Sequence, residues 1–119
     1  MTTCARCVLP ILASEDPLPL EHQEVFAREA HEGASRTRCP ACGQDFLRLW
    51  REVGGWDIED IWVYWVPITT AEIAQLRAAS DPLKQASTLV MSRTRLVRMP
   101  SGTLHVSSES REIGIWMHT

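Results

Sequence analysis

The sequence predicts a single α+β domain over residues 1–119, with an N-terminal part that carries an inserted helix packed on a small antiparallel sheet with one or two further helices. Three observations predict it: short cysteine pairs confined to the first 43 residues, strand-like alternation after residue 45, and helix-capping signals after residue 68. A chain of 119 residues matches the usual size of one domain. Apolar residues at 45% and charged residues at 23% are ordinary for a globular protein.

The N-terminal part, residues 1–43, is expected to bind a metal ion and to contain a helical insertion. Its first residues read as extended chain, and Pro10, Pro17 and Pro19 then mark a loop that no regular helix would carry. From about Leu20 to His31, apolar and charged residues follow a helical spacing, so the sequence predicts a helix of about three turns.

The second part, residues 44–119, is expected to form the sheet and the remaining helices. Residues 46–53 read as a strand, followed by a Gly54-Gly55 turn and a second strand from Asp60 to Val66. Apolar residues occupy both faces of this second strand, which therefore is predicted to be central.

Helix signals follow Pro67. Thr69 and Glu72 form a capping-box pattern that opens a helix through about Ala79. Ser80-Asp81-Pro82 is suited to start a further short turn of helix, because proline is favoured at the first helical position. Two strands joined by Pro100-Ser101-Gly102 are predicted next, and residues 113–117 form a possible last strand.

All four cysteines occur in two C-x₂-C pairs, Cys4 with Cys7 and Cys39 with Cys42. Two residues between thiols let both sulfurs reach one ion from a single turn, and zinc prefers four such ligands in a tetrahedron. The sequence therefore predicts one structural Zn²⁺ held by the four thiolates. Pro40 and Gly43 suit the tight turn that such a site needs.

Other roles for the thiols stay open. The cysteines could be unmetallated, or one pair could perform thiol redox chemistry, which requires an accessible thiol of low pKa. A catalytic zinc would need an open ligand position, and His22 and His31 are the histidines that could replace a thiolate. No sequence motif of a known hydrolase, nucleotide-binding loop or deaminase is present, which favours a protein that is not an enzyme.

A second candidate site combines acidic and aromatic residues around the predicted turn. Tryptophan supplies a large rigid surface with one hydrogen-bond donor, and acidic neighbours attract a basic partner. The same rings could instead form the core, because the chain has five Trp but only two Phe. The candidate partner-binding residues are Glu52, Trp56, Asp57, Glu59, Asp60 and Trp62.

Charge is distributed unevenly along the chain. Residues 1–60 contain six arginines and eleven acidic residues, whereas residues 61–119 contain six basic and four acidic residues. Nucleic-acid binders usually present a basic surface, so a nucleic-acid partner is not expected for the first half. Arginines near the predicted C-terminal hairpin could contact phosphates or could protect the edge of the sheet: Arg93, Arg95, Arg98 and Arg111.

The Cys-Pro-x-Cys-Gly sequence at 39–43, with the earlier C-x₂-C pair at 4–7, resembles small bacterial Cys₄ zinc-ribbon and zinc-knuckle proteins. The resemblance implies that Cys4, Cys7, Cys39 and Cys42 are ligands of an architectural ion, and it implies no activity. The chain departs from compact ribbons in its long insertion.

These features predict a zinc-stabilised, non-enzymatic module that binds a basic protein, in an antitoxin, immunity-type or adaptor role. The alternative is a zinc-ribbon regulator that binds nucleic acid through its C-terminal arginines. The chain contains no run of 18 apolar residues and no signal-like start, so we expect a cytoplasmic protein that does not cross a membrane. In a reducing cytoplasm, paired cysteines bind metal more often than they form structural disulfides.

Overall fold

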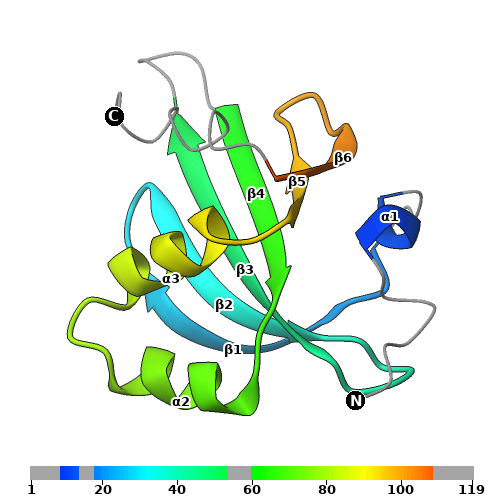
Figure 1. The fold of residues 1–119 in the computed structure, drawn as a ribbon. Helices are drawn as coiled ribbons and strands as arrows, with labels where there is room; N and C mark the ends of the chain where they lie inside the picture. The colour runs from blue at the N-terminus through cyan, green and yellow to red at the C-terminus, as the bar shows by residue number, and fades with distance from the viewer. Residues whose placement is uncertain (1–8, 14–17, 54–59, 109–119) are drawn as a thin grey trace.

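Six strands form one antiparallel sheet whose spatial order is the chain order, β1-β2-β3-β4-β5-β6 (Figure 1). The computed structural model describes residues 9–13, 18–53 and 60–108. Its strands are β1 (Glu21–Arg28), β2 (Glu32–Arg38), β3 (Asp45–Val53), β4 (Asp60–Pro67), β5 (Arg95–Arg98) and β6 (Leu104–Ser107). A short helix, α1 (Leu9–Leu12), precedes the sheet, and α2 (Thr70–Ala78) and α3 (Pro82–Met91) connect β4 to β5. The predicted α+β class with an antiparallel sheet and two further helices is confirmed.

The β4 strand is central and buried on both faces, as its sequence predicts. Val63 and Trp65 belong to one buried cluster, whereas Tyr64 and Val66 belong to another on the opposite face. The second cluster packs against α2 and α3, so these helices cover one face of the sheet. The opposite face carries no helix among the described residues except α1, which packs beside β5 and β6 (Figure 1). Because α2 and α3 both lie on the other face, we call this one the helix-free face, although the short α1 packs at its β5–β6 side.

Both predicted helix starts are present. The Thr69 hydroxyl accepts a hydrogen bond from the backbone of Glu72, and the Glu72 carboxylate accepts one from the Thr69 backbone, which completes the capping box of α2. Asp81 caps α3, and Pro82 occupies its first turn. The α3 helix runs for ten residues and is longer than the short turn that the sequence predicts. Its apolar stripe provides three buried residues, Leu83, Ala86 and Val90.

The helix expected from Leu20 to His31 is wrong, because this segment forms β1, at the edge of the sheet. The register of β1 on β2 shifts twice, between His22 and Glu24 and between Val25 and Ala27. Each irregularity breaks the two-residue alternation that would reveal a strand, and the remaining pattern is similar to that of a helix. The insertion between the cysteine pairs therefore contributes the strands β1 and β2, together with the four-residue α1.

Two further boundaries differ from the expectation. Pro10 lies in the first turn of α1. At this position the N–H that proline lacks would make no helical hydrogen bond. The expected limit between the two parts of the chain, at residue 43, falls in the turn between β2 and β3, which are neighbours in the same sheet. The hairpin of β5 and β6 is confirmed, with Gly102 at φ +93° in its turn. The possible strand at 113–117 lies outside the described residues.

A network of ion pairs connects the edge strand β1 to β2, β3 and α2. Glu24 accepts hydrogen bonds from Arg36 of β2 at 2.8 Å and from Arg77 of α2 at 3.1 Å. Arg36 also donates a hydrogen bond to Asp45 of β3, at 2.8 Å. Hydrogen bonding from Arg77 is the main reason that the pKa of Glu24 is lowered, and the Asp45 bond is the main reason that the pKa of Arg36 is raised. This network links three strands and one helix.

Candidate functional site

The second cysteine pair lies in the tight turn that joins β2 to β3. The Cys39 backbone N–H donates to the Gln44 carbonyl at 2.9 Å, and the Gly43 N–H donates to the Cys39 carbonyl at 2.8 Å. Gly43 has φ +79°, a conformation that glycine adopts far more readily than other residues. The turn therefore holds both cysteines on a closed backbone loop.

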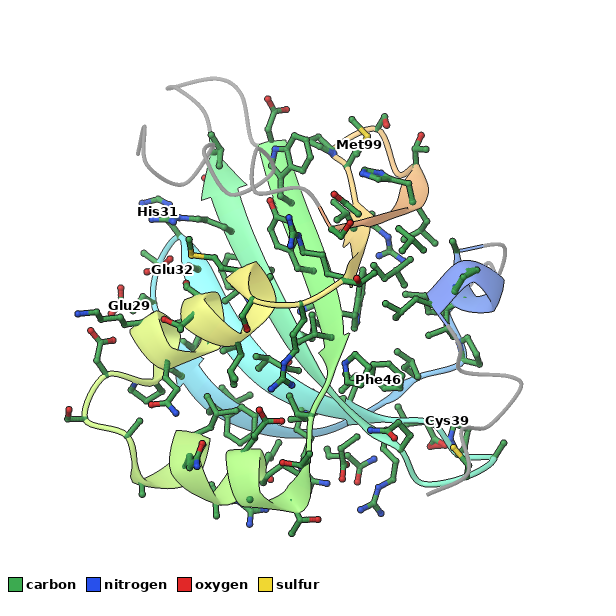
Figure 2. All side chains as sticks on the ribbon, viewed as in Figure 1. Glu29, His31, Glu32, Cys39, Phe46 and Met99 are labelled. Atoms are coloured by element: carbon green, nitrogen blue, oxygen red, sulfur yellow. The ribbon has the colours of Figure 1, made fainter. Side chains whose placement is uncertain are left out.

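The two described cysteines have different environments. Cys39 is 1% exposed and belongs to the buried cluster of the helix-free face, together with Phe46 (Figure 2). Cys42 is exposed. A hollow of about 240 Å³ is lined by Cys39 with Pro19, Pro40 and Ala41. One thiol is thus shielded beside a small surface hollow, while the other is accessible to solvent.

Cys4 and Cys7 lie outside the described residues, so the predicted set of four ligands is only half visible. The described residues contain no group of three or more histidine, cysteine or acidic side chains placed to hold an ion. The donor chemistry of Cys39 and Cys42 fits zinc, because two thiolates two residues apart are half of a common tetrahedral set. Leu9 and Leu12, which follow Cys7 closely in sequence, belong to the same buried cluster as Cys39.

The described residues of the predicted partner surface lie at the opposite end of the sheet. Trp56, Asp57 and Glu59 lie outside the described residues, between the ends of β3 and β4. Glu52 pairs in register with Ile61, so its side chain is on the helix-free face, where its Oε1 lies 3.5 Å from His31 Nδ1.

Asp60 and Trp62 lie one strand away on β4, on the helix side of the sheet. Trp62 is partly buried and packs against the core cluster beneath α2 and α3. Alternation along the strands therefore separates Glu52 from Trp62 by the thickness of the sheet. The structure brings Glu52 and Asp60 to the same end of the sheet but does not join all described members into one face.

The described C-terminal arginines do not form one surface. Arg93 donates to the Glu72 carboxylate and to the Pro67 carbonyl, and Arg95 is fully buried, donating to the carbonyls of Val90 and Arg93. Arg98 lies on the helix-free face over the Trp65 ring. Arg111 lies outside the described residues.

The candidate alternative zinc ligands are also apart. His22 is exposed on the edge strand β1, and His31 is exposed in the turn before β2. These two histidines lie at opposite ends of the β1–β2 hairpin, because His22 pairs with Thr37 whereas His31 precedes Glu32.

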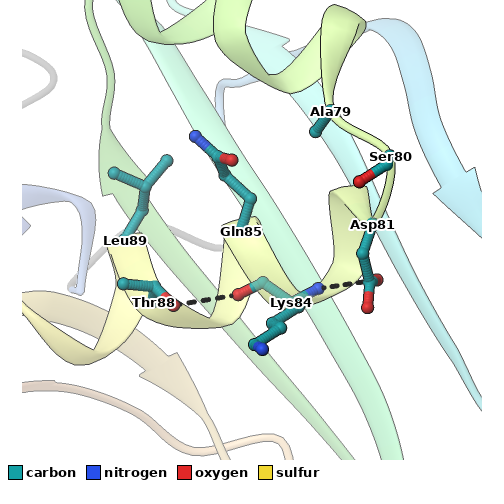
Figure 3. Close-up of a pocket in the computed structure, with 7 residues that line it drawn as sticks. All are labelled: Ala79, Ser80, Asp81, Lys84, Gln85, Thr88 and Leu89. Carbon is teal, nitrogen blue, oxygen red and sulfur yellow. Dashed lines mark hydrogen bonds between the residues drawn. The ribbon is translucent and has the colours of Figure 1, made fainter.

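A hollow of about 550 Å³ lies where α2 meets α3 (Figure 3). Two of its polar side chains, Asp81 and Thr88, form hydrogen bonds to the backbone of α3. Asp81 accepts from the Lys84 backbone at 3.2 Å, and the Thr88 hydroxyl donates to the Lys84 carbonyl at 3.0 Å (Figure 3). The described residues that line it include no cysteine or histidine.

One arrangement of charged residues was not anticipated from the sequence. Arg48 of β3 and Arg98 of β5 both lie over the ring of Trp65, with guanidinium carbons 5.9 and 5.3 Å from its centroid. Arg48 alternates with Phe46 and Trp50 along β3, and this charged residue between two aromatic residues was the available signal.

The fold and the cysteine turn define this protein as a small α+β protein with a sequential six-stranded antiparallel sheet. In comparisons with protein-family models, with curated proteins and with solved structures, no match to this chain was found. No helix in the described part of the chain has both the length and the apolar character needed to cross a membrane.

Proposed function

We propose that this protein is a non-enzymatic, zinc-stabilised module that binds a basic protein. In this proposal one structural Zn²⁺ is held at one end of the sheet by Cys4, Cys7, Cys39 and Cys42. The opposite end engages the partner through an acidic and aromatic surface, which comprises Glu52, Trp56, Asp57, Glu59, Asp60 and Trp62.

The single observation that carries the proposal is the turn between β2 and β3. Cys39 and Cys42 are held on a loop closed by two backbone hydrogen bonds and by the left-handed Gly43. Leu9, the first described residue after Cys7 in the sequence, belongs to the buried cluster that also contains Cys39. This shared cluster supports the proposal of one ion for both cysteine pairs.

The two ends of the sheet suit separate roles. The nine-residue strand β3 connects the cysteine turn to the end that carries Glu52, a span of about 27 Å. An ion at the first end would act on folding and would not touch a partner at the second. Partner binding in an antitoxin or immunity-type role would cover a basic active site, and charge complementarity would speed the encounter.

The acidic character of the partner end supports a basic partner. Glu29 and Glu32 lie in and beside the β1–β2 turn (Figure 2). Glu52 lies at the facing end of β3. Glu32 pairs with Arg51 at 3.4 Å, and Glu29 is exposed. A basic protein is favoured over nucleic acid as the partner, because two of the arginines that phosphate binding would need, Arg93 and Arg95, are engaged within the fold.

Elemental analysis of protein purified under reducing conditions tests the zinc site. We expect one equivalent of Zn²⁺, and we expect Cys39→Ser to lower zinc affinity sharply and to destabilise the fold, since metal binding and folding are linked in such sites. Protein that is fully reduced, folded and free of zinc would contradict the proposal.

Two glycines offer a matched control. Gly43 and Gly102 both have positive φ in hairpin turns, and an added Cβ would meet no atom within 4 Å at either. Gly43→Ala and Gly102→Ala should therefore cause a similar backbone strain, of about 1 kcal/mol. Only Gly43→Ala should also weaken zinc binding in a competition assay with a chromophoric chelator. Equal zinc affinities in the two variants would argue against a metal at the first turn.

The partner surface is tested separately with a double variant, Trp56→Ala with Asp57→Lys. A basic protein retained by the wild-type chain from the source cell, and then shown to bind it in purified form, should be lost with this variant. It should be retained by a control that also introduces one lysine, but on α3, Ser87→Lys. A purified partner that binds both variants equally would place the interface elsewhere, without affecting the metal proposal.

A further inference from the structure

The helix-free face contains arginines that have no carboxylate partner among the described residues. Among the described residues, five arginines contact a carboxylate, and Arg95 contacts backbone carbonyls; the five are Arg36, Arg38, Arg51, Arg77 and Arg93. Within the described part of the chain, Arg28, Arg48 and Arg98 have no carboxylate or hydrogen-bonding partner. Arg28 and Arg48 line the same cavity, and Arg98 lies beside Arg48 over Trp65.

Arg48 is the most unusual of the three. It lies partly buried on the central part of the sheet, between the aromatic residues Trp50 and Phe46 of its own strand. Burial lowers the pKa of its guanidinium, and the positive charge of Arg98 lowers it further. A cation that is removed from water beside a second cation is unfavourable unless an opposite charge is supplied. The Trp65 ring compensates only in part, because a cation–π contact is weaker than an ion pair with good geometry.

The cavity beside Arg48 has a volume of about 230 Å³ and is lined on β1, β2 and β3. Its polar lining consists of groups that can donate hydrogen bonds, from His22, Arg28, Ser35, Arg48 and Trp50. No acidic residue lines it in the described part of the chain. Glu52 follows Trp50 on this face of β3, and its carboxylate contacts His31 at the end of the strand.

Trp50 gives this cavity a rigid wall. Its indole lies against Gly33, because a Cβ built on Gly33 would come 2.4 Å from Trp50 Nε1. The indole N–H has no acceptor among the described residues. Trp50 is therefore held in place by packing on the backbone of β2, while its donor stays available.

We propose that this cavity on the helix-free face is a binding site for an oxyanion group, a phosphate or a carboxylate of a small molecule, with Arg48 as its principal contact and Arg98 as a supporting charge. Guanidinium groups bind such oxyanions through two parallel hydrogen bonds, and Ser35 and Trp50 add neutral donors. The volume accommodates a single anionic group with a small substituent. This site is independent of the proposed zinc ion and of the proposed acidic surface.

The experiment is an NMR titration of the full chain, as purified, with inorganic phosphate, acetate and chloride at matched ionic strength. Binding is followed at the backbone amides of Ser35 and Arg48 and at the Trp50 indole N–H. Saturable shifts with phosphate identify a phosphate site, and saturable shifts with acetate identify a carboxylate site; either result supports the proposal. Shifts that are the same for all three salts would overturn it.

Variants show whether the response depends on the named arginine. Arg48→Met should weaken oxyanion binding by about tenfold or more, which is the loss expected for one charged hydrogen-bonding partner. Arg38→Met is the matched control, because Arg38 is on β2, is exposed and contacts Asp45 at 3.4 Å, and it should leave the affinity unchanged. Arg98→Met provides a second test if Arg48→Met does not fold. Affinity that survives both Arg48→Met and Arg98→Met would refute the assignment.

Discussion

The close approach of Gly33 to the Trp50 indole predicts that Gly33→Ala destabilises the wild-type protein but stabilises a variant that lacks the indole. A Cβ at position 33 would lie 2.4 Å from Nε1, 2.8 Å from Cε2 and 3.1 Å from Cζ2 of the Trp50 indole. Ordinary contacts begin near 3.4 Å, so the ring must move by about 1 Å. Gly33 does not have a positive φ, so alanine brings no backbone strain of that kind.

Gly33→Ala should therefore destabilise the wild-type protein by about 1–3 kcal/mol, the usual cost of overpacking a well-packed site. With Trp50→Ala already present, the obstructing ring is gone. The same Gly33→Ala change should then stabilise the protein by about 0.4–1 kcal/mol, because alanine restricts the unfolded chain more than glycine does.

Urea denaturation of the wild type, both single variants and the double variant measures this cycle. We expect a coupling of about 1–3 kcal/mol between the two sites. Destabilisation by Gly33→Ala of equal size in both backgrounds would refute the reasoning, since it would show that the cost does not arise from the indole.

Further predictions concern pH, a helix cap and the core. Arginine hydrogen bonds lower the pKa of both Glu24 and Glu72 below 4.5, so their stabilising contribution is complete above that pH and is lost as the pH falls through the lowered values. Urea midpoints measured from pH 6 to pH 3 should fall less steeply for Glu72→Gln than for the wild type, and parallel curves would contradict this. Thr69→Ala should cost about 1 kcal/mol through loss of the cap of α2, whereas Thr70→Ala, at an exposed position, should cost less than half of that in the same denaturation assay. Leu76→Ala should cost about 2–5 kcal/mol, because Leu76 is the completely buried residue by which α2 packs on the sheet; a loss below 1 kcal/mol would show that the helix does not pack as described.

The regular elements were predictable where one local signal dominates. Continuous apolar residues identified β4 as central, and the side-chain spacing of Thr69 and Glu72 identified the start of α2, because both signals act within a few residues. The edge strand β1 was predicted as a helix, since its register shifts conceal its alternation and its pairing depends on β2. Local sequence does not report such pairing.

The candidate sites likewise combine local features, which the sequence predicts, with arrangements that depend on distant residues. The cysteine turn could be predicted from spacing and from Gly43, which are local features. The separation of Glu52 from Trp62 depends on strand alternation across a turn, and the meeting of Arg48 with Arg98 over Trp65 depends on three strands. Such arrangements need the register of the whole sheet, which the sequence does not specify by itself.

The chain-order arrangement of the sheet has a consequence for folding kinetics. Every pair of neighbouring strands is joined by a brief connection except β4 and β5, between which residues 68–94 intervene. Closing a longer segment costs more chain entropy, and contacts distant in sequence form more slowly. We therefore expect the first four strands to associate early, and the α2–α3 pair to dock before β5 adds to β4. Backbone amides of β5 should acquire protection from hydrogen exchange later than those of β3 during refolding.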